Sequence, residues 1–154
     1  MDVLSSSYYI ARTGAQCANC GRTTAVLALA LPPDHQTLDV DAAEDADWQI
    51  AGANAFLFHV TDLSHFVRRR LLDLSQTYRP IAKKGGSKLP WANHCKDCGF
   101  VLEDQELHCE PGAFMPMSEA DAANIEVIHI DEMFEAAAAG YALDPEFFSS
   151  MRKL

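Results

Sequence analysis

Short runs of apolar residues in the N-terminal half of the chain are typical of β-strands. Residues 6–13 (SSYYIART) mix aromatic and β-branched side chains with polar ones, and residues 22–31 (RTTAVLALAL) form a longer run that stops at two prolines. Residues 53–63 (ANAFLFHVTDL) predict a further strand, and a short one is expected around 36–40 within an acidic stretch. These runs predict a sheet.

A helical period follows the strand over 53–63. The apolar residues of LSHFVRRRLLDLS fall on one helical face, and they are Leu63, Phe66, Val67, Leu71 and Leu74. Either Asp62 or Ser64 can cap this helix. The basic stretch 78–90 that follows (YRPIAKKGGSKLP) contains two prolines and a Gly-Gly pair, which favours a loop.

The remainder predicts a strand, a turn and a strand over 91–109, and then alternating helix and strand. Helices are expected over 118–124, 132–140 and 145–154, with a strand over 125–130. The sequence Ser118-x-x-Asp121 resembles a capping box, Gly140 suits a helix end, and Pro145 suits a helix start. The expected fold class is therefore α+β: an antiparallel sheet with three to four helices, one of them between the two cysteine pairs and the rest C-terminal.

Length and composition favour one globular domain. The chain has 154 residues, of which 49% are hydrophobic and 22% charged. Its first residues lack the basic and apolar regions of a secretory signal, and no apolar run is long enough to span a bilayer, so we expect a cytoplasmic protein without membrane contact.

Two Cys-x-x-Cys-Gly motifs are the clearest chemical signal. Cys17 and Cys20 form the first pair, Cys95 and Cys98 form the second, and Cys109 is left over. Each such turn can direct two thiolates at one point, and the following glycine lets the chain turn tightly. Two turns facing each other would supply the four sulfurs of a closed, tetrahedral, structural Zn²⁺ site.

These four cysteines and their flanking strands resemble a zinc ribbon. The stretch WANHCKDCGF…ELHCEPGAF is also similar to short, uncharacterised bacterial zinc-ribbon-like proteins, which implies a bacterial or phage source. Ribbon pairs usually lie roughly 15–20 residues apart, whereas 74 residues separate Cys20 from Cys95. The expected domain, 1–154, thus has a ribbon element formed by 7–31 and 90–108. An insertion would occupy 32–89, and a C-terminal αβα unit 118–154.

Alternatives to this site remain open. A thioredoxin-like redox pair would require each motif to begin a helix, whereas strand-like sequence follows both motifs. Iron could replace zinc among four sulfurs. The His94 side chain should point away from Cys95 if 90–94 is a strand, which favours a supporting or surface role. Cys109 is expected to be a buried, small apolar residue rather than a ligand.

The charge pattern limits the partner. The formal net charge is −10, but the segment 68–96 carries +7, which leaves −17 for the rest of the chain. The acidic remainder suits a basic protein partner, and one version of this is an immunity or antitoxin protein that masks a basic toxin. The basic segment 68–96 offers the alternative of nucleic-acid binding, as in many zinc ribbons.

An enzyme would need a second group of residues, because a zinc ion with four thiolates has no open position. The candidate side chains are His59, His65, His108 and His129, with Glu103, Asp104, Glu106 and Glu110. They match no recognisable catalytic motif. The sequence therefore favours a non-enzymatic, zinc-stabilised protein-binding module. Nucleic-acid binding and an unrecognised histidine–carboxylate enzyme are the alternatives.

Overall fold

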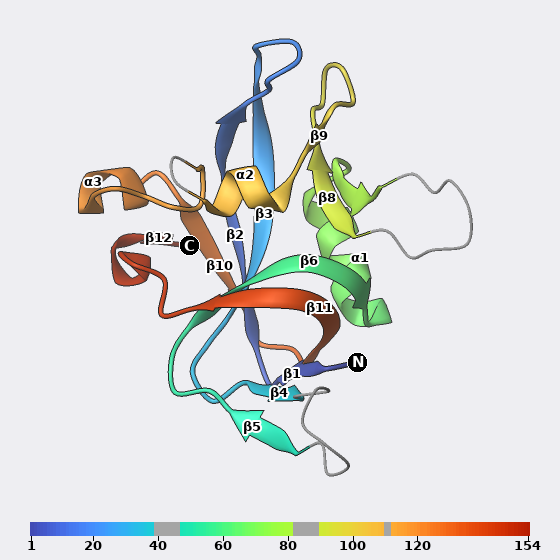
Figure 1. Ribbon diagram of the computed structural model, residues 1–154, viewed down its shortest axis with the longest axis vertical. Coiled ribbons are helices and arrows are strands. Elements are labelled where there is room, and N and C mark those ends of the chain that lie inside the picture. The colour runs from blue at the N-terminus through green and yellow to red at the C-terminus, as the bar shows by residue number, and fades with distance from the viewer. Residues whose placement is uncertain (39–46, 82–89, 110–111) are drawn as a thin grey trace.

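The computed structural model describes residues 1–38, 47–81, 90–109 and 112–154 (Figure 1). Within these residues the protein is mostly β, with a curled nine-stranded sheet, a three-stranded sheet and a few short helices. The expected α+β class with three to four helices is therefore wrong. The strands expected over 22–31 and 53–63 and the helix after them are present, and most of the error lies in the C-terminal part.

The large sheet has the spatial order β12 (Arg152–Lys153), β10 (Glu126–Ile130), β2 (Tyr8–Gln16), β3 (Thr23–Leu31), β6 (Ala55–Leu63), β11 (Phe134–Leu143), β1 (Val3–Ser5), β4 (Gln36–Leu38) and β5 (Trp48–Ile50). The small sheet has the order β7 (Tyr78–Pro80), β8 (Trp91–His94) and β9 (Val101–Leu102). The helices are α1 (His65–Leu74), α2 (Asp104–His108), α3 (Glu119–Ala122) and the 3₁₀ turn η1 (Phe148–Ser150).

The large sheet curls because it returns to its own first strand. Only Ser6 and Ser7 separate β1 from β2. β2 pairs with β3, β3 with β6, β6 with β11, and β11 with β1, all antiparallel. The buried residues form two clusters, and β3 contributes to both. Leu27, Leu29 and Leu31 belong to one and Val26, Ala28 and Ala30 to the other, so the run Val26–Leu31 is buried throughout. A strand that is covered on both faces reads as a continuous apolar run rather than an alternating one.

The helix α1 packs one face on this core. Val67 and Leu71 are buried, and Ser64 is the N-cap residue, although its side chain makes no capping hydrogen bond. Phe66 differs from the expected pattern because 68% of its surface is exposed. The apolar face of α1 is thus narrower than the spacing of its apolar residues predicts.

The two helices expected over 132–140 and 145–154 are absent. The alanine-rich stretch forms β11, which pairs with β1 and β6 and buries Phe134 and Ala136 on alternate positions. Alanine favours a helix in isolation, but pairing on both edges and burial of the Phe134 ring outweigh that small preference. The last residues form η1 and then β12, which pairs in parallel with β10.

The small sheet carries the second cysteine pair. All four residues of β8 are buried, and the loop from β8 to β9 contains Cys95 and Cys98. The strand expected to follow is present only as β9, and the residues after it form helix α2. In Figure 1 the loop between β2 and β3 and the loop between β8 and β9 lie at the same end of the molecule.

Candidate metal centre

Four cysteine sulfurs meet between these two loops. The Sγ atoms of Cys17, Cys20, Cys95 and Cys98 all lie within 4.8 Å of one another. The Sγ atoms of Cys17 and Cys98 are 3.6 Å apart, as are those of Cys20 and Cys95. Sulfurs about 2.3 Å from a tetrahedral zinc ion would lie about 3.8 Å apart. The cluster therefore has nearly the dimensions of a four-sulfur metal site.

The two loops have the same backbone conformation. In the first, the Cys17 amide donates to the Arg22 carbonyl over 2.9 Å, and the Gly21 amide donates to the Cys17 carbonyl over 2.9 Å. In the second, the Cys95 amide donates to Phe100 over 2.8 Å, and the Gly99 amide donates to Cys95 over 2.9 Å. Each Cys-x-x-Cys-Gly motif thus folds locally into the same turn, which points its two sulfurs in one direction.

Glycine is required at the fifth position of both motifs. Gly21 has φ of 77° and Gly99 has φ of 76°, in the left-handed region that costs other residues about 1–2 kcal/mol. A Cβ atom at either position would meet no heavy atom within 4 Å. The cost of a side chain there would therefore come from the backbone conformation and not from a clash.

The sulfur environment favours a thiolate at Cys98. The Asn19 side-chain amide donates to the Cys98 sulfur over 3.5 Å, and with the backbone amide of Phe100 it lowers the pKa of the Cys98 thiol to about 6. Cys17 and Cys95 are buried, whereas Cys20 and Cys98 are exposed. An ion held here would thus be shielded by protein on one side and reachable from solvent on the other.

Three contacts hold the loops together besides the sulfurs. The buried Asn93 side chain of β8 accepts from the Leu27 amide over 2.8 Å and donates to the Leu27 carbonyl over 2.9 Å. The Lys96 amide donates to the Thr24 hydroxyl over 3.2 Å. An exposed ion pair of 3.7 Å joins Arg22 to Asp97.

Sequence reasoning did not single out Asn93, Thr24 or Asn19. A polar residue within the apolar stretch PWANHC was the available signal for Asn93, because an amide placed between buried positions needs a partner. The polar side chains of Thr24 and Asn19 lie next to the first cysteine pair in the sequence, but nothing there pairs them with the second pair.

The donor set fits zinc. Four thiolates around one zinc ion form a closed structural site, in which no position remains for water or substrate. The grouping of Cys17, Cys20, Cys95 and Cys98 suggests such a metal site, which would tie β2 and β3 to β8 and β9.

The neighbouring residues His94 and Cys109 lie outside this cluster. The buried His94 ring forms hydrogen bonds with the carbonyl oxygens of Thr77 and Ala92, at 3.1 and 3.0 Å. It therefore supports the chain next to the cluster. Cys109 is exposed at the end of α2, so the expectation that it is buried is wrong. The expectation failed because residues 104–108 form a helix, which changes the direction of the next residue.

The histidine and carboxylate candidates for an enzyme site are partly brought together. Asp104 is buried, and its carboxylate accepts a 2.8 Å hydrogen bond from the backbone amide of His59. Burial raises the pKa of Asp104, although that hydrogen bond opposes the rise. Burial, with a smaller effect of His59, lowers the pKa of His108 to about 4. The contact uses the His59 backbone, so it fixes the packing of α2 on β6 and does not pair an imidazole with a carboxylate.

The other candidates are spread over the surface. Four of them are exposed: His65, His129, Glu103 and Glu106. Glu110 lies outside the described residues. His129 belongs to β10, and its ring centroid is 5.1 Å from that of Tyr9. These positions do not form one site with Asp104.

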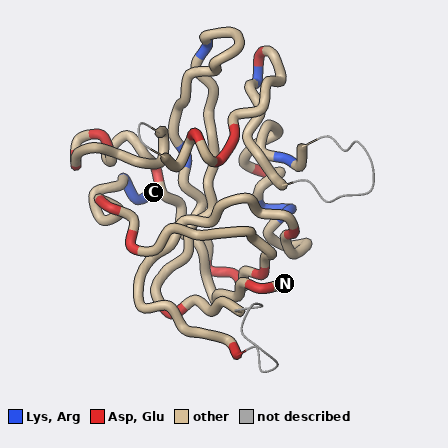
Figure 2. Tube along the Cα trace, in the orientation of Figure 1, with Lys and Arg blue, Asp and Glu red and all other residues tan. Residues whose placement is uncertain are grey.

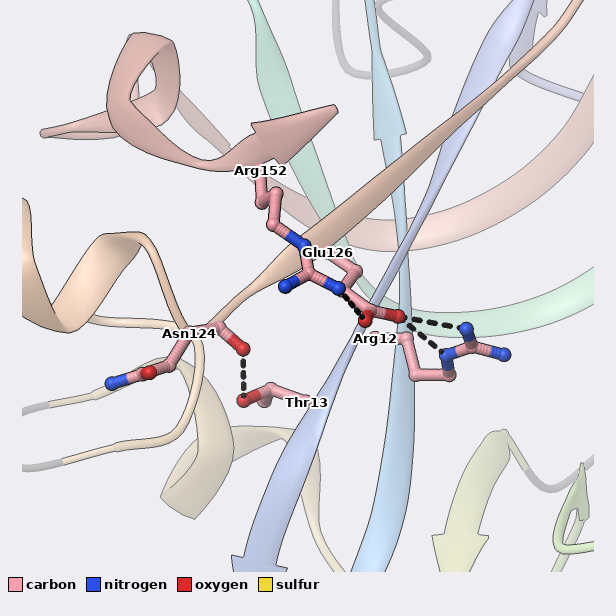
Figure 3. Close-up of polar contacts among 5 residues, drawn as sticks. All are labelled: Arg12, Thr13, Asn124, Glu126 and Arg152. Atoms are coloured by element: carbon pink, nitrogen blue, oxygen red, sulfur yellow. Dashed lines mark hydrogen bonds and ion pairs between the residues drawn. The ribbon is translucent and has the colours of Figure 1, made fainter. Parts of the chain in front are cut away.

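Charged residues are unevenly placed on the described surface. Figure 2 shows acidic residues on α2 and α3 and near the N-terminus, whereas the C-terminal strand β12 consists of Arg152 and Lys153. Several arginines are locally neutralised. Glu126 binds Arg12 over 2.7 Å and Arg152 over 2.8 Å, and the contact with Arg12 is the main cause of its lowered pKa (Figure 3). Arg70 of α1 is paired with Glu132.

The basic segment 68–96 is only partly described. Arg68, Arg69 and Arg70 are exposed on α1, Arg79 belongs to β7, and Lys96 lies in the second cysteine loop. The other three cations, Lys83, Lys84 and Lys88, lie outside the described residues. The described cations are thus distributed over three elements.

Comparison with known proteins adds no family. No protein-family model matches the chain, and no curated protein or solved structure is significantly similar to it. The site is therefore interpreted from its own geometry.

The helices in the described parts of the chain are too short, or not apolar enough, to cross a membrane.

Proposed function

We propose that the chain is a non-enzymatic, zinc-stabilised module that binds a basic protein partner. The zinc-binding part of this proposal rests on the cluster of four cysteine sulfurs within 4.8 Å of one another, contributed by two loops that are distant in the sequence. Such a cluster would hold a zinc ion with a structural role, because four thiolates complete its coordination.

The metal would fix tertiary structure rather than fold an otherwise unfolded chain. The chain already buries an extensive core, whereas the loops holding the cysteines are largely exposed. Zinc bound by four thiolates in small domains contributes on the order of 10 kcal/mol of folding free energy. In this protein that energy would hold the β8–β9 hairpin against the β2–β3 hairpin, as one ribbon-like element within a single domain.

The charge of the chain supports a basic partner. The formal net charge is −10, and Arg12, Arg70 and Arg152 are each paired with a glutamate of the chain itself. Complementary charge accelerates encounter and disfavours partners of the same sign. An immunity or antitoxin role, in which this surface would cover a basic toxin, is the sharpest version of this proposal.

The metal half is tested by elemental analysis of protein purified without chelators. We expect one zinc ion per chain, and X-ray absorption should show four sulfur ligands at about 2.3 Å. Protein that contains no transition metal and does not bind added zinc would contradict this half of the proposal.

The partner half is tested by affinity capture from the native host at low and high salt, with captured proteins identified by mass spectrometry. We expect a basic protein whose purified form binds this chain with an affinity that decreases steeply as salt increases. An electrophoretic shift assay with single- and double-stranded probes tests the alternative. Binding of nucleic acid without a basic protein partner would favour the role of the 68–96 segment.

A further inference from the structure

A small hollow of about 210 Å³ is lined by aromatic rings and by two acidic residues. Phe56 and Phe58 come from β6, His108 ends α2, and Phe114 follows in the loop after it. Asp144 and Glu146, which follow β11, complete the wall. The hollow is separate from the cysteine cluster in its lining residues.

The four rings form one packed group around His108. Its ring centroid is 4.7 Å from that of Phe58 in an edge-on arrangement, and 5.1 Å from that of Phe114 in a stacked one. The centroid of Phe56 is 5.5 Å away. Aromatic faces carry negative electrostatic potential, and a cation placed over them is attracted.

His108 adds an uncharged acceptor to this group. Burial lowers its pKa to about 4, so its ring is neutral at pH 7. A neutral imidazole has one nitrogen that donates and one that accepts a hydrogen bond. No residue in the described part of the chain forms a hydrogen bond with either nitrogen, although the ring borders the hollow. A bound donor could therefore use the accepting nitrogen.

The two acidic residues of the hollow are exposed, and the backbone of one of them is held by a hydrogen bond. Asp144 and Glu146 are exposed, and among the described residues neither forms an ion pair. The Asp144 amide donates to the Asn54 carbonyl over 2.7 Å, and Asp144 has φ of 52°. Asp and Asn tolerate this left-handed conformation better than most residues. Two carboxylates without cationic partners thus border a group of ring faces.

The size of the hollow limits what can enter it. Sites for drug-sized ligands start at about 300 Å³, so 210 Å³ suits a single side chain. A second hollow of about 620 Å³ shares the segment Asp144–Glu146 and is also bordered by Tyr9, Phe148 and Lys153. It adjoins the first along this shared segment.

We propose that the hollow between β6, α2 and the segment 144–146 binds an arginine side chain of a basic protein partner. The planar guanidinium would stack on the rings while its N–H groups donate to the Asp144 and Glu146 carboxylates and to His108. Arginine fits better than lysine because it stacks on aromatic faces and donates through a planar fork. This inference deepens the proposed function, on which it rests for the nature of the partner.

The test uses three blocked tripeptides, in which arginine, citrulline or leucine stands between two glycines. Citrulline has nearly the shape of arginine without its charge. Binding to the zinc-loaded full chain is followed by two-dimensional NMR. We expect the arginine peptide alone to shift the His108 ring signals and the signals of Phe58 and Phe114.

Two matched double variants test the two acidic residues of the hollow. Asp144→Asn with Glu146→Gln should weaken binding of the arginine peptide by about tenfold or more. Asp34→Asn with Asp47→Asn removes the same charge from exposed positions elsewhere and should leave binding unchanged. Asp34 also has positive φ, at 74°, so the two pairs are matched in that respect. Equal binding of the citrulline or leucine peptide, or no binding of the arginine peptide at millimolar concentration, would overturn the inference.

The outcomes separate this site from the wider proposal. If a basic protein binds the chain and the Asp144/Glu146 variant binds it equally well, the inference fails and the proposed function stands. If the arginine peptide binds at this hollow but no basic protein is captured, the site stands and the proposed function fails.

Discussion

The amide group of Asn93 is paired with both backbone polar groups of Leu27, which lies 66 residues away in the sequence. The side-chain oxygen accepts from the Leu27 amide over 2.8 Å, and the side-chain nitrogen donates to the Leu27 carbonyl over 2.9 Å. Asn93 lies two residues before Cys95, and Leu27 belongs to the strand that follows Cys20. One buried side chain thus sets the position of β8 beside β3, and with it the distance between the two cysteine pairs.

Replacing Asn93 by alanine should destabilise the protein strongly. The substitution leaves the buried amide and carbonyl of Leu27 without partners, which should cost about 3 kcal/mol or more of unfolding free energy. Urea unfolding of the zinc-loaded protein measures the change, and zinc titration should show weaker binding. Asn124→Ala, at an exposed position, serves as control and should change stability by less than about 0.5 kcal/mol. A stable Asn93→Ala variant with unchanged zinc affinity would show that the metal alone positions the hairpin.

Removing a cysteine of the cluster should abolish tight zinc binding. In Cys95→Ser we expect less than one zinc ion per chain and a lower melting temperature, since zinc at a thousand times its Kd stabilises a folded protein by about 4 kcal/mol. Elemental analysis and calorimetry measure both. Cys109→Ser is the control for zinc content, because Cys109 lies outside the cluster. Equal loss of zinc in both variants would contradict the assignment of the ligands.

Alanine at Gly21 or Gly99 should destabilise the metal loops. Each substitution forces a Cβ atom into the left-handed region and should cost about 1 kcal/mol of stability. Gly52→Ala provides the control, because a Cβ atom there also meets nothing within 4 Å but Gly52 is not at positive φ. Chemical unfolding compares the three variants. If Gly21→Ala and Gly52→Ala had the same effect, the turn conformation would not be the reason for glycine at position 21.

His108 should make the protein less stable in mild acid. Its pKa is lowered to about 4 in the folded protein from 6.5, so the unfolded chain binds the proton more tightly. Above about pH 6.5 the His108 ring is neutral in both states, so this shift does not change the free energy of unfolding. Between pH 6.5 and 4 the unfolded chain takes up the proton first, and the free energy of unfolding falls by up to about 3 kcal/mol. Unfolding at several pH values should show a weaker pH dependence for His108→Gln than for the parent chain.

The control for this comparison is His65→Gln, because His65 is exposed on α1. That variant should retain the pH dependence of the parent chain. Acid also releases a thiolate-bound metal, but all three proteins share that effect, so the difference between them isolates His108. An identical pH profile for the parent and His108→Gln would show that the ring is not buried as described.

Local sequence was a good guide where one short pattern decides the conformation. The two Cys-x-x-Cys-Gly motifs each specify a turn through a few near-neighbour hydrogen bonds and a glycine at positive φ. Ser118 accepts from the Asp121 amide, as its capping pattern predicts, and begins α3. The apolar runs that became β3 and β6 are long enough to specify strands that are covered by the core.

The two cysteine motifs also predicted that their four sulfurs meet at one site. Tertiary structure alone decided the conformation of β11, the place of Cys109 and the contacts that hold the two cysteine loops side by side. The alanine-rich β11 is a strand because β1 and β6 lie on either side of it, and no pattern within ten residues contains that information. The Asn93–Leu27 contact likewise joins two segments whose separate sequences do not refer to each other. Propensity and capping act over a few residues and contribute about 2 kcal/mol or less each, whereas pairing and burial depend on which segments meet.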